Sequence, residues 1–271
     1  MDLHHIETYL CPINFKEIQT WQQGWVWLAG GTWIFSEPQP QMQALIDLQS
    51  LSWSELNATS TGLTIGATCV MNRLLHALYP AEWIGVQALQ SAVRELASFK
   101  VQNVATVAGN LCLALPASTF APVMLALGAI YQIQPLSDSS YWIPAALFQT
   151  GARQTILNPG DVLRKIWIAN DNLKWRVNYQ RICVASAGVA IATVVGAYNP
   201  ETSQLRFGIG ASIPAPQLIE FDHLPTVETL TQTLDEQIPI TNYFSDVSAS
   251  AAYRHHVTKV LLRRSLQELI S

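Results

Sequence analysis

The sequence has little charge. Asp, Glu, Lys and Arg make up only 13% of its 271 residues, which is about half the share found in an average soluble domain. Such a shortage favours a surface that partner subunits partly cover, because the cores of interfaces are depleted in charge. A chain with an unusually large core would show the same shortage. The net charge is −4 and no basic run occurs, which argues against nucleic acid as a partner.

Cysteine is scarce as well. The cysteines are far apart and form no Cys-x-x-Cys pair, so their spacing encodes neither an iron–sulfur cluster nor a zinc site. We expect reduced, mostly buried thiols in a cytoplasmic protein. The four residues are Cys11, Cys69, Cys112 and Cys183.

The sequence also lacks a long apolar run. The longest weakly polar stretch covers residues 182–198, and this is shorter than the roughly 20 apolar residues of a membrane-spanning helix. A pair of buried strands, or a strand followed by a helix, is the better interpretation. The first residues, Met1 to His5, form neither a basic nor a long apolar segment, so we expect no signal peptide.

The chain divides into three segments, residues 1–55, 56–171 and 172–271. Strands and helices are segregated rather than strictly alternating, which favours an α+β fold. The pattern predicts strands at Trp25–Ala29, Ala44–Leu48 and Leu63–Ala67, helices within 72–78, 88–98 and 117–127, a hairpin of Val184–Val195 with Leu205–Ile209, and a last helix capped by Ser248 or Ser250.

Two glycine loops accompany these elements. Ala29-Gly30-Gly31-Thr32 comes directly after a predicted strand, and the second loop, 105–110, contains Gly109. Neither loop has the Gly-x-Gly-x-x-Gly pattern of a dinucleotide fingerprint or the Lys-Ser/Thr of a P-loop. Successive backbone N–H groups in such turns form concave anion sites that suit a pyrophosphate. For each loop taken alone, a plain tight turn is the alternative.

The residues around both loops resemble a known family. The first loop, from Leu28, is similar to the first flavin loop of the FAD-binding subunits of molybdenum hydroxylases. The second loop is similar to their second flavin loop. The resemblance covers nearly the whole chain in the expected order. It is carried by Leu28 to Thr32, Asn103 to Leu111, Ala114 to Ser118, Arg206 to Ala211, Pro214 to Pro216, Asp246 to Ser250, Tyr253-Arg254 and Leu262 to Leu266.

This resemblance to the xanthine dehydrogenase and carbon monoxide dehydrogenase flavoproteins implies an FAD-binding fold of the PCMH/vanillyl-alcohol-oxidase type. Two α+β subdomains, 1–55 and 56–171, would hold an extended FAD with its pyrophosphate against both glycine loops. The C-terminal flavoprotein domain, 172–271, would close over the flavin. Leu157 would lie near the isoalloxazine ring, and Arg176 would replace a lysine of some relatives. The implied FAD-binding residues are Trp27, Leu28, Ala29, Gly30, Gly31, Thr32, Trp33, Ile34, Thr106, Val107, Ala108, Gly109, Asn110, Thr119, Leu157 and Arg176.

Two positions depart from the family pattern. Trp33 stands where the family often has an acidic or amide residue, and its indole could stack on the cofactor or pack in the core. Thr119 stands where the family commonly has an aspartate that holds polar atoms of FAD. A threonine hydroxyl still forms hydrogen bonds but carries no charge. Whether FAD binding is kept, weakened or lost is therefore left open.

The resemblance implies an oxidoreductase subunit that transfers electrons. Electrons would leave a molybdopterin-binding large subunit, cross [2Fe–2S] clusters on a small subunit, reach FAD on this chain and pass to NAD⁺, oxygen or another acceptor. No side chain here need act as an acid or base, and no metal is expected on this chain. A flavin-free structural subunit of the same complex is the alternative. A self-contained flavin oxidase is a further one, although 271 residues leave little room for a substrate domain.

Overall fold

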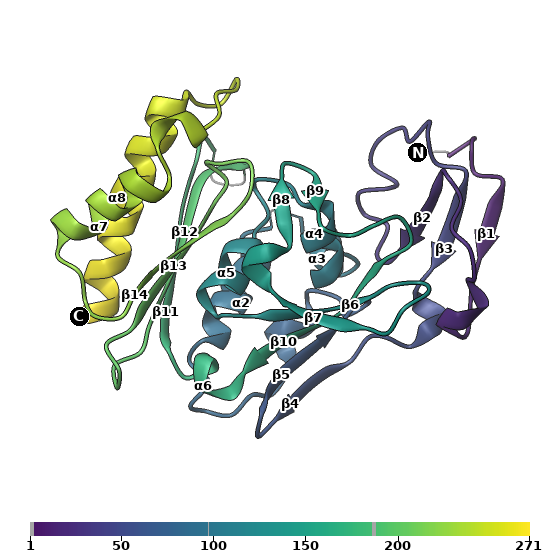
Figure 1. Cartoon of the computed structure of the whole chain (residues 1–271), viewed down its shortest axis with the longest axis horizontal. Helices are drawn as coiled ribbons and strands as arrows, with labels where there is room; N and C mark the ends of the chain where they lie inside the picture. The colour runs from purple at the N-terminus through teal and green to yellow at the C-terminus, as the bar shows by residue number, and fades with distance from the viewer. Residues whose placement is uncertain (1–2, 97, 186–187) are drawn as a thin grey trace.

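The computed structural model describes residues 3–96, 98–185 and 188–271. Its strands form three larger sheets and one short hairpin. Figure 1 shows these sheets side by side, with the N-terminal sheet at one end, the largest sheet in the middle, and the C-terminal sheet with two helices at the other end. No helix in this part of the chain is long and apolar enough to cross a membrane.

The N-terminal sheet has three strands in the order β1-β3-β2, all parallel. Its central strand is buried, because the side chains of Ala44 and Ile46 are almost inaccessible to solvent. The core around them is small and is completed by half-buried tryptophans. The strands are β1 (Thr8–Leu10), β2 (Trp25–Leu28) and β3 (Ala44–Asp47).

The middle sheet is antiparallel, in the order β4-β5-β10-β6-β7. In β6 alternate residues are buried, including Tyr131 and Ile133, as expected of a strand with one face against a core. Helices pack on this sheet and share its core. The elements are β4 (Leu56–Thr59), β5 (Gly62–Gly66), β6 (Ile130–Gln134), β7 (Tyr141–Pro144), β10 (Val162–Ala169), α1 (Arg73–His76), α2 (Val86–Arg94), α3 (Phe99–Gln102), α4 (Val107–Leu113) and α5 (Ala121–Ala126), with the hairpin of β8 (Gln149–Gly151) and β9 (Gln154–Thr155).

The C-terminal sheet is an antiparallel meander that is covered on both faces. Val194 packs with the helices α7 and α8, whereas its neighbour Val195 belongs to the core of the middle sheet. At Gly208 an added Cβ would lie only 2.0 Å from the carbonyl oxygen of Pro122, so this sheet packs directly against α5. The elements are β11 (Arg176–Cys183), β12 (Ala190–Tyr198), β13 (Leu205–Gly210), β14 (Gln217–Phe221), α6 (Asn170–Leu173), α7 (Val227–Gln237) and α8 (Ala251–Ile270).

This double burial explains the weakly polar stretch 182–198. The stretch contains the end of β11 and all of β12, and in β12 every residue from Ile191 to Tyr198 is buried. A strand covered on both faces has apolar residues in succession rather than in alternation. The interpretation as buried strands is therefore confirmed for β12 only. Ile182 and Cys183 of β11 are half-buried, and Val184 and Val189, which were expected in or beside a buried strand, are exposed and lie outside the strands. Residues 186–187 lie outside the described part of the chain.

A buried arginine fastens α8 to the C-terminal sheet. Arg254 is 2% exposed, and its Nη1 donates hydrogen bonds to the carbonyl oxygens of Ile191 (2.7 Å) and Ala211 (2.9 Å). Its Nη2 forms an ion pair with Asp246 at 2.7 Å. The guanidinium thus joins two strand ends to the loop before the helix. Ser250 is the helix N-cap, accepting a hydrogen bond from the N–H of Tyr253, as one of the two predicted caps.

Several helix boundaries differ from those expected. The helix expected within 117–127 begins only at Ala121, because the hydroxyl of Ser118 accepts a hydrogen bond from the N–H of Ala121 and ends the preceding turn. The helix expected within 88–98 is α2, which ends at Arg94. Ser98 instead caps α3, since its hydroxyl accepts from the N–H of Val101. Short polar side chains therefore divide runs that look continuous in the sequence.

Each of the three sheets takes its strands from one of the three segments expected from the sequence. The boundary drawn at 171/172 falls inside α6, whose Leu173 is buried in the core of the middle sheet. The segments are therefore closely joined in space, and their exact limits stay a prediction.

Candidate functional site

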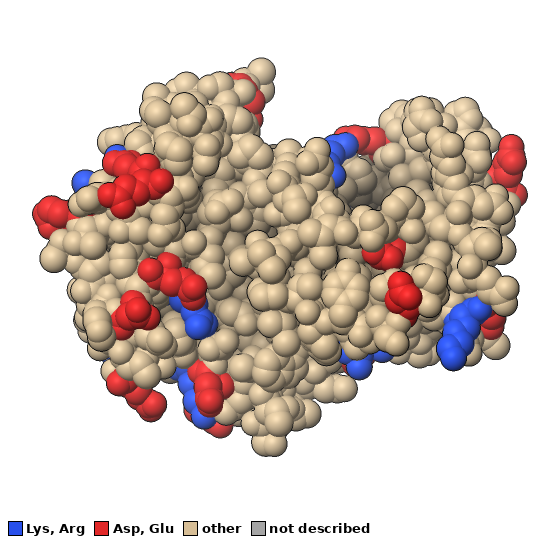
Figure 2. Space-filling view, viewed as in Figure 1, with Lys and Arg blue, Asp and Glu red and all other residues tan. Residues whose placement is uncertain are grey.

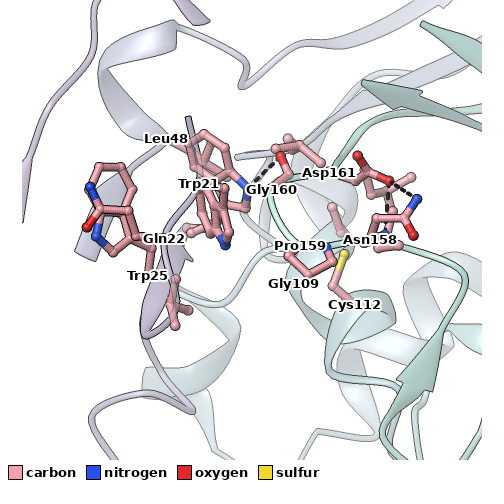
Figure 3. Close-up of a pocket in the computed structure, with 18 of the residues that line it drawn as sticks. Trp21, Gln22, Trp25, Leu48, Gly109, Cys112, Asn158, Pro159, Gly160 and Asp161 are labelled. Atoms are coloured by element: carbon pink, nitrogen blue, oxygen red, sulfur yellow. Dashed lines mark hydrogen bonds between the residues drawn. The ribbon is translucent and has the colours of Figure 1, made fainter. Parts of the chain in front are cut away.

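A cavity of about 700 Å³ lies between the N-terminal sheet and the middle sheet. This volume is within the range of small-molecule sites, roughly 300–1,000 Å³. Figure 3 shows its two walls, with Trp21, Trp25 and Leu48 on one side and Gly109, Cys112 and Pro159 on the other. The cavity is lined by Trp21, Gln22, Gln23, Gly24, Trp25, Val26, Trp27, Ala29, Leu48, Ala67, Ala108, Gly109, Cys112 and residues 157–163.

The wall from the N-terminal sheet is aromatic. The rings of Trp21 and Trp27 are tilted by 34° with centroids 4.8 Å apart, and Trp21 meets Trp25 edge to face at 5.9 Å. Trp25 and Trp27 are alternate residues of β2, and Trp21 precedes that strand. Large flat rings favour a planar ligand, because offset stacking adds to the gain from burying apolar area.

The opposite wall is built around the turn Asn158–Asp161. The carboxylate of Asp161 accepts hydrogen bonds from the backbone N–H (2.9 Å) and the side-chain amide (3.1 Å) of Asn158. The Nε1 of Trp27 donates to the carbonyl oxygen of Gly160 at 3.2 Å and so connects the two walls (Figure 3). Because its carboxylate is engaged in this turn, Asp161 is a structural part of the wall.

Cys112 lies on the wall formed by α4. Its side chain is exposed and opens onto the cavity, and the protein atoms packed near the sulfur raise its pKa to about 12. The thiol is therefore neutral at physiological pH, and a neutral thiol is a poor nucleophile. Cys112 contributes a soft apolar surface to the cavity. The expectation of mostly buried thiols is wrong, because Cys11 is exposed as well and Cys69 is the buried one of the four.

The first glycine loop is in direct contact with the second. A Cβ added at Gly30 would lie 2.2 Å from the carbonyl oxygen of Val104, so only glycine allows the two backbones to approach this closely. Gly31 has φ +67°, in the left-handed region that favours glycine, and an added Cβ there would lie 2.6 Å from the ring of Phe35. Within this loop Ala29 is the residue that lines the cavity.

The second glycine loop begins a helix beside the cavity. Thr106 caps α4, since its hydroxyl accepts a hydrogen bond from the N–H of Gly109 at 3.0 Å. Gly109 lines the cavity, and an added Cβ would meet only that hydroxyl oxygen, at 2.8 Å. The space on the other side of Gly109 is open, so a ligand can approach its backbone closely. Such a surface suits the diphosphate of a dinucleotide.

Thr119 lies where the middle part of the chain meets β11. Its carbonyl oxygen accepts a hydrogen bond from the hydroxyl of Tyr179 at 3.4 Å. Burial raises the pKa of Tyr179 above its ordinary value, so the phenol stays protonated. The hydroxyl oxygen of Thr119 is buried without a hydrogen-bond partner. A buried polar atom without a partner is costly, and a polar ligand atom would satisfy it.

The structure brings together most of the residues expected to bind FAD, but not all of them at the cavity. Those that line it are Trp27, Ala29, Ala108, Gly109 and Leu157. Those that lie in the two loops behind or beside the lining are Leu28, Gly30, Gly31, Thr32, Trp33, Ile34, Thr106, Val107 and Asn110.

Two of these loop residues make contacts of their own. Asn110 accepts a hydrogen bond from the hydroxyl of Ser118 at 2.6 Å. Trp33 lies under the guanidinium of Arg153. Neither Trp33 nor Asn110 is among the residues that line the cavity.

Arg176 lies elsewhere. It is the exposed first residue of β11, paired with Tyr198 at the α6 end of the C-terminal sheet, and it does not line the cavity. Its role in FAD binding stays a prediction.

Sequence analysis missed several lining residues. Trp21 and Trp25 stand close to Trp27, and their spacing before a glycine loop was a signal that could have identified them. The turn Asn158–Asp161 was recognised as a turn, but no sequence feature indicates which part of the chain it faces. That this turn forms the wall opposite the tryptophans is known only from the tertiary structure.

Residues 5–170, more than half of the chain, match a family model described as the FAD binding domain in molybdopterin dehydrogenase. The chain belongs to this family. The resemblance found in the sequence is therefore confirmed, and so is the presence of an FAD-binding domain. The cavity and both glycine loops lie within the matched residues.

Several curated proteins are similar to parts of the chain. Xanthine dehydrogenase/oxidase of Gallus gallus is 31% identical over 124 residues, which is 42% of this chain and 9% of that protein. The nicotine 6-hydroxylase medium subunit of Paenarthrobacter nicotinovorans is 23% identical over 188 residues, or 66% of each chain. The matched stretch therefore spans about a tenth of the length of a xanthine dehydrogenase.

Solved structures match nearly the whole chain. Carbon monoxide dehydrogenase from Hydrogenophaga pseudoflava has a chain with a TM-score of 0.83 and 19% identity, covering 99% of this chain and 98% of that one. Quinoline 2-oxidoreductase from Pseudomonas putida 86 has a chain with a TM-score of 0.81 and 18% identity, with the same coverage. The expected α+β fold is confirmed by these likenesses.

The residues of the site fit FAD. The cavity is large enough for part of a dinucleotide, its aromatic wall suits a planar ring, and the backbone at Gly109 is open to a diphosphate. The hydroxyl of Thr119 is buried without a partner and does not line this cavity, so a contact of Thr119 with FAD in place of the aspartate stays a prediction. The replacement by threonine removes a charge but keeps a group that can donate and accept hydrogen bonds.

Proposed function

We propose that this chain is the FAD-carrying electron-transfer subunit of a molybdenum-dependent oxidoreductase. The observation that carries the proposal is the cavity between the two walls, which reaches the second glycine loop inside the segment that matches the FAD-binding family. Electrons would arrive from [2Fe–2S] clusters on one partner subunit and leave to an acceptor such as NAD⁺ or oxygen.

The role of this chain's own residues is to bind and orient the cofactor. Ala29, Ala108 and Gly109 present a surface with small or no side chains to the diphosphate. The tryptophans of β2 exclude water from one side of the cavity, and the turn at Asn158 closes the other. Bound FAD supplies the chemistry, because it accepts two electrons and releases them one or two at a time. The protein needs no acid or base for that exchange.

The partners in this proposal are a small subunit with [2Fe–2S] clusters and a large subunit with the molybdopterin cofactor, in a cytoplasmic complex. The name of the nicotine 6-hydroxylase medium subunit indicates that this relative works with other subunits. Figure 2 shows few charged side chains over the middle of the face that it presents. Exposed apolar residues of the middle part include Tyr141, Trp142 and Leu147. A surface with few charges and with exposed aromatic and apolar residues favours contacts between subunits.

A flavin-free structural subunit of the same complex is a second candidate. It is favoured by the loss of the aspartate at position 119 and by the contact of Trp33 with Arg153 near the first loop. The cavity beside Gly109 and the match to the FAD-binding family favour the flavoprotein instead.

The flavin content of the protein tests the proposal. The complete chain, purified with its natural partners, is denatured in acid and the supernatant is examined for FAD. We expect one FAD for each chain, and we expect clusters and molybdenum in the same chromatographic peak. A folded protein that contains no FAD, and takes up none from an excess, would establish the structural alternative.

A further inference from the structure

Arg153 is held firmly against the end of α4. It lies in the tight turn between β8 and β9 with φ +58°, a conformation that side chains other than glycine seldom adopt. Its backbone N–H donates to the carbonyl oxygen of Ala114 at 2.8 Å. The side-chain amide of Gln149 donates to the same oxygen at 2.9 Å. The hairpin is thereby anchored to the helix that begins at the second glycine loop.

The side chain of Arg153 crosses to the first glycine loop. Its Cζ lies 4.7 Å from the centroid of the Trp33 ring, and Trp33 follows Gly31 by two residues. A planar guanidinium stacked on an indole keeps all of its N–H groups in the plane, free to bind an anion. Among the residues that the structure describes, no carboxylate forms an ion pair with Arg153. The positive charge is therefore available.

Arg153 stands beside the first glycine loop and is not one of the residues that line the cavity. Within the described part of the chain, the cavity lining contains no lysine or arginine, and its one acidic residue is Asp161. A dinucleotide brings two negative charges on its diphosphate. Backbone N–H groups bind such oxygens but leave their net charge without a counter-charge.

We infer that Arg153, positioned by Trp33, binds the diphosphate of the dinucleotide and supplies its counter-charge. This inference rests on the proposed function and adds a residue that the two glycine loops do not provide. It also gives Trp33 a role. The indole stands where the family pattern has a polar residue, and it holds the arginine beside the loop rather than binding the cofactor itself.

The test compares FAD with riboflavin, which has the same ring system but no phosphate. Flavin-free full chain is titrated with each compound, and binding is followed by the quenching of flavin fluorescence. We expect Arg153→Gln to weaken FAD binding about tenfold, because one charge-assisted hydrogen bond contributes on that order. Riboflavin binding should change little. Arg153→Lys keeps the charge but loses the contact of the guanidinium with Trp33. Its affinity for FAD should lie between that of the natural protein and that of Arg153→Gln.

Salt provides a second measurement. The affinity of the natural protein for FAD should fall with ionic strength more steeply than that of Arg153→Gln, since screening acts on the charge pair. Trp33→Leu should reduce FAD affinity in the same direction, because it removes the surface that holds the guanidinium. Arg264→Gln, on the exposed side of α8, removes one positive charge far from the loops and serves as the matched control.

The outcomes are distinct. Equal FAD affinity and equal salt dependence in Arg153→Gln and the natural protein would overturn the inference. A gain in FAD affinity would overturn it too, and would mean that the stack of Arg153 on Trp33 blocks the cleft. If the natural protein itself binds no FAD, the proposed function fails. This result is read from the natural protein alone and is therefore distinct from a failure of the inference about Arg153.

Discussion

The indole N–H of Trp27 donates a hydrogen bond to the carbonyl oxygen of Gly160 across 3.2 Å, and this contact spans the two walls of the cavity. Trp27 belongs to β2 of the N-terminal sheet, and Gly160 belongs to the turn that leads into β10 of the middle sheet. The distance between the walls, and so the width of the cavity, is set partly by this single bond.

Replacing Trp27 with phenylalanine should loosen the cavity. Phenylalanine keeps an aromatic ring but leaves the carbonyl of Gly160 without its donor, at a cost of about 1 kcal/mol in the free energy of unfolding. We expect a several-fold loss in FAD affinity together with this small loss of stability, measured by flavin titration and urea unfolding. Trp142→Phe, on the exposed strand β7, is the matched control and should change neither quantity.

The two loop glycines should respond differently to substitution. Gly30→Ala places a Cβ against the carbonyl of Val104, so we expect a loss of about 1–3 kcal/mol or more in the free energy of unfolding. In Gly109→Val the added Cβ would lie 2.8 Å from the hydroxyl oxygen of Thr106, the N-cap of α4. We therefore expect FAD occupancy to fall, with a loss of about 1 kcal/mol in the free energy of unfolding from the disturbed cap. Occupancy is read from the flavin spectrum and stability from thermal unfolding. Full occupancy in Gly109→Val would mean that the second loop does not approach the cofactor.

Arg254 should be among the most sensitive positions in the C-terminal part of the chain. Arg254→Met keeps the volume of the stem but leaves the carbonyl oxygens of Ile191 and Ala211 without donors. Leaving a buried polar atom without its hydrogen-bond partner costs about 1–3 kcal/mol. We expect a fall in melting temperature of many degrees, measured by calorimetry. Arg264→Met, on the exposed side of the same helix, should unfold like the natural protein.

The ion pair of Asp246 with Arg254 should make stability depend on pH in the acid range. The hydrogen bond from Arg254 holds the pKa of Asp246 below its ordinary value of 3.8 in the folded protein. The folded state therefore binds the proton less readily than the unfolded state. The stabilisation is complete above pH 3.8 and is lost as the pH falls through the lower folded-state pKa. Urea unfolding between about pH 2.5 and pH 6 should reveal the loss.

Asp246→Asn is the variant that checks this pH dependence. It should be less stable than the natural protein near neutral pH and should lose less stability on acidification. Asp171→Asn is the control, because it changes an exposed carboxylate that forms an ion pair with Lys174 on the surface, and it should keep the acid profile of the natural protein. The same acid profile in Asp246→Asn and the natural protein would show that Asp246 does not contribute.

The sequence predicted where the strands and loops of the site lie along the chain, but not which of them are in contact in the folded protein. The short apolar run Trp25–Ala29 and the glycines that follow identified β2 and its loop, because these signals are local. The close approach of Gly30 to Val104 has no local signal, since the residues are far apart in the chain. The resemblance implied that Gly30 binds FAD. The structure shows that Gly30 packs against another loop, and its contact with FAD stays a prediction. The position of Arg176, away from the cavity, depends on tertiary packing in the same way.

The sequence predicted buried strands in the C-terminal sheet, but not which cores cover them. Its apolar run indicated buried strands, and β12 is one. The run could not indicate that Val194 and Val195 face two separate cores, because burial on either side of a strand leaves the same pattern in the sequence.

The contact of Gly208 with Pro122 has a consequence for any attempt to divide the protein. Cutting the chain before β11 would leave α5 without the strand that its backbone touches, and would expose the side of the middle core to which Val195 and Ala197 belong. A fragment that ends there would present a fresh apolar face to water and would tend to aggregate. The family model ends at residue 170, but the unit that folds extends well past it. Limited proteolysis of the native protein should accordingly trim loops and leave the two parts associated.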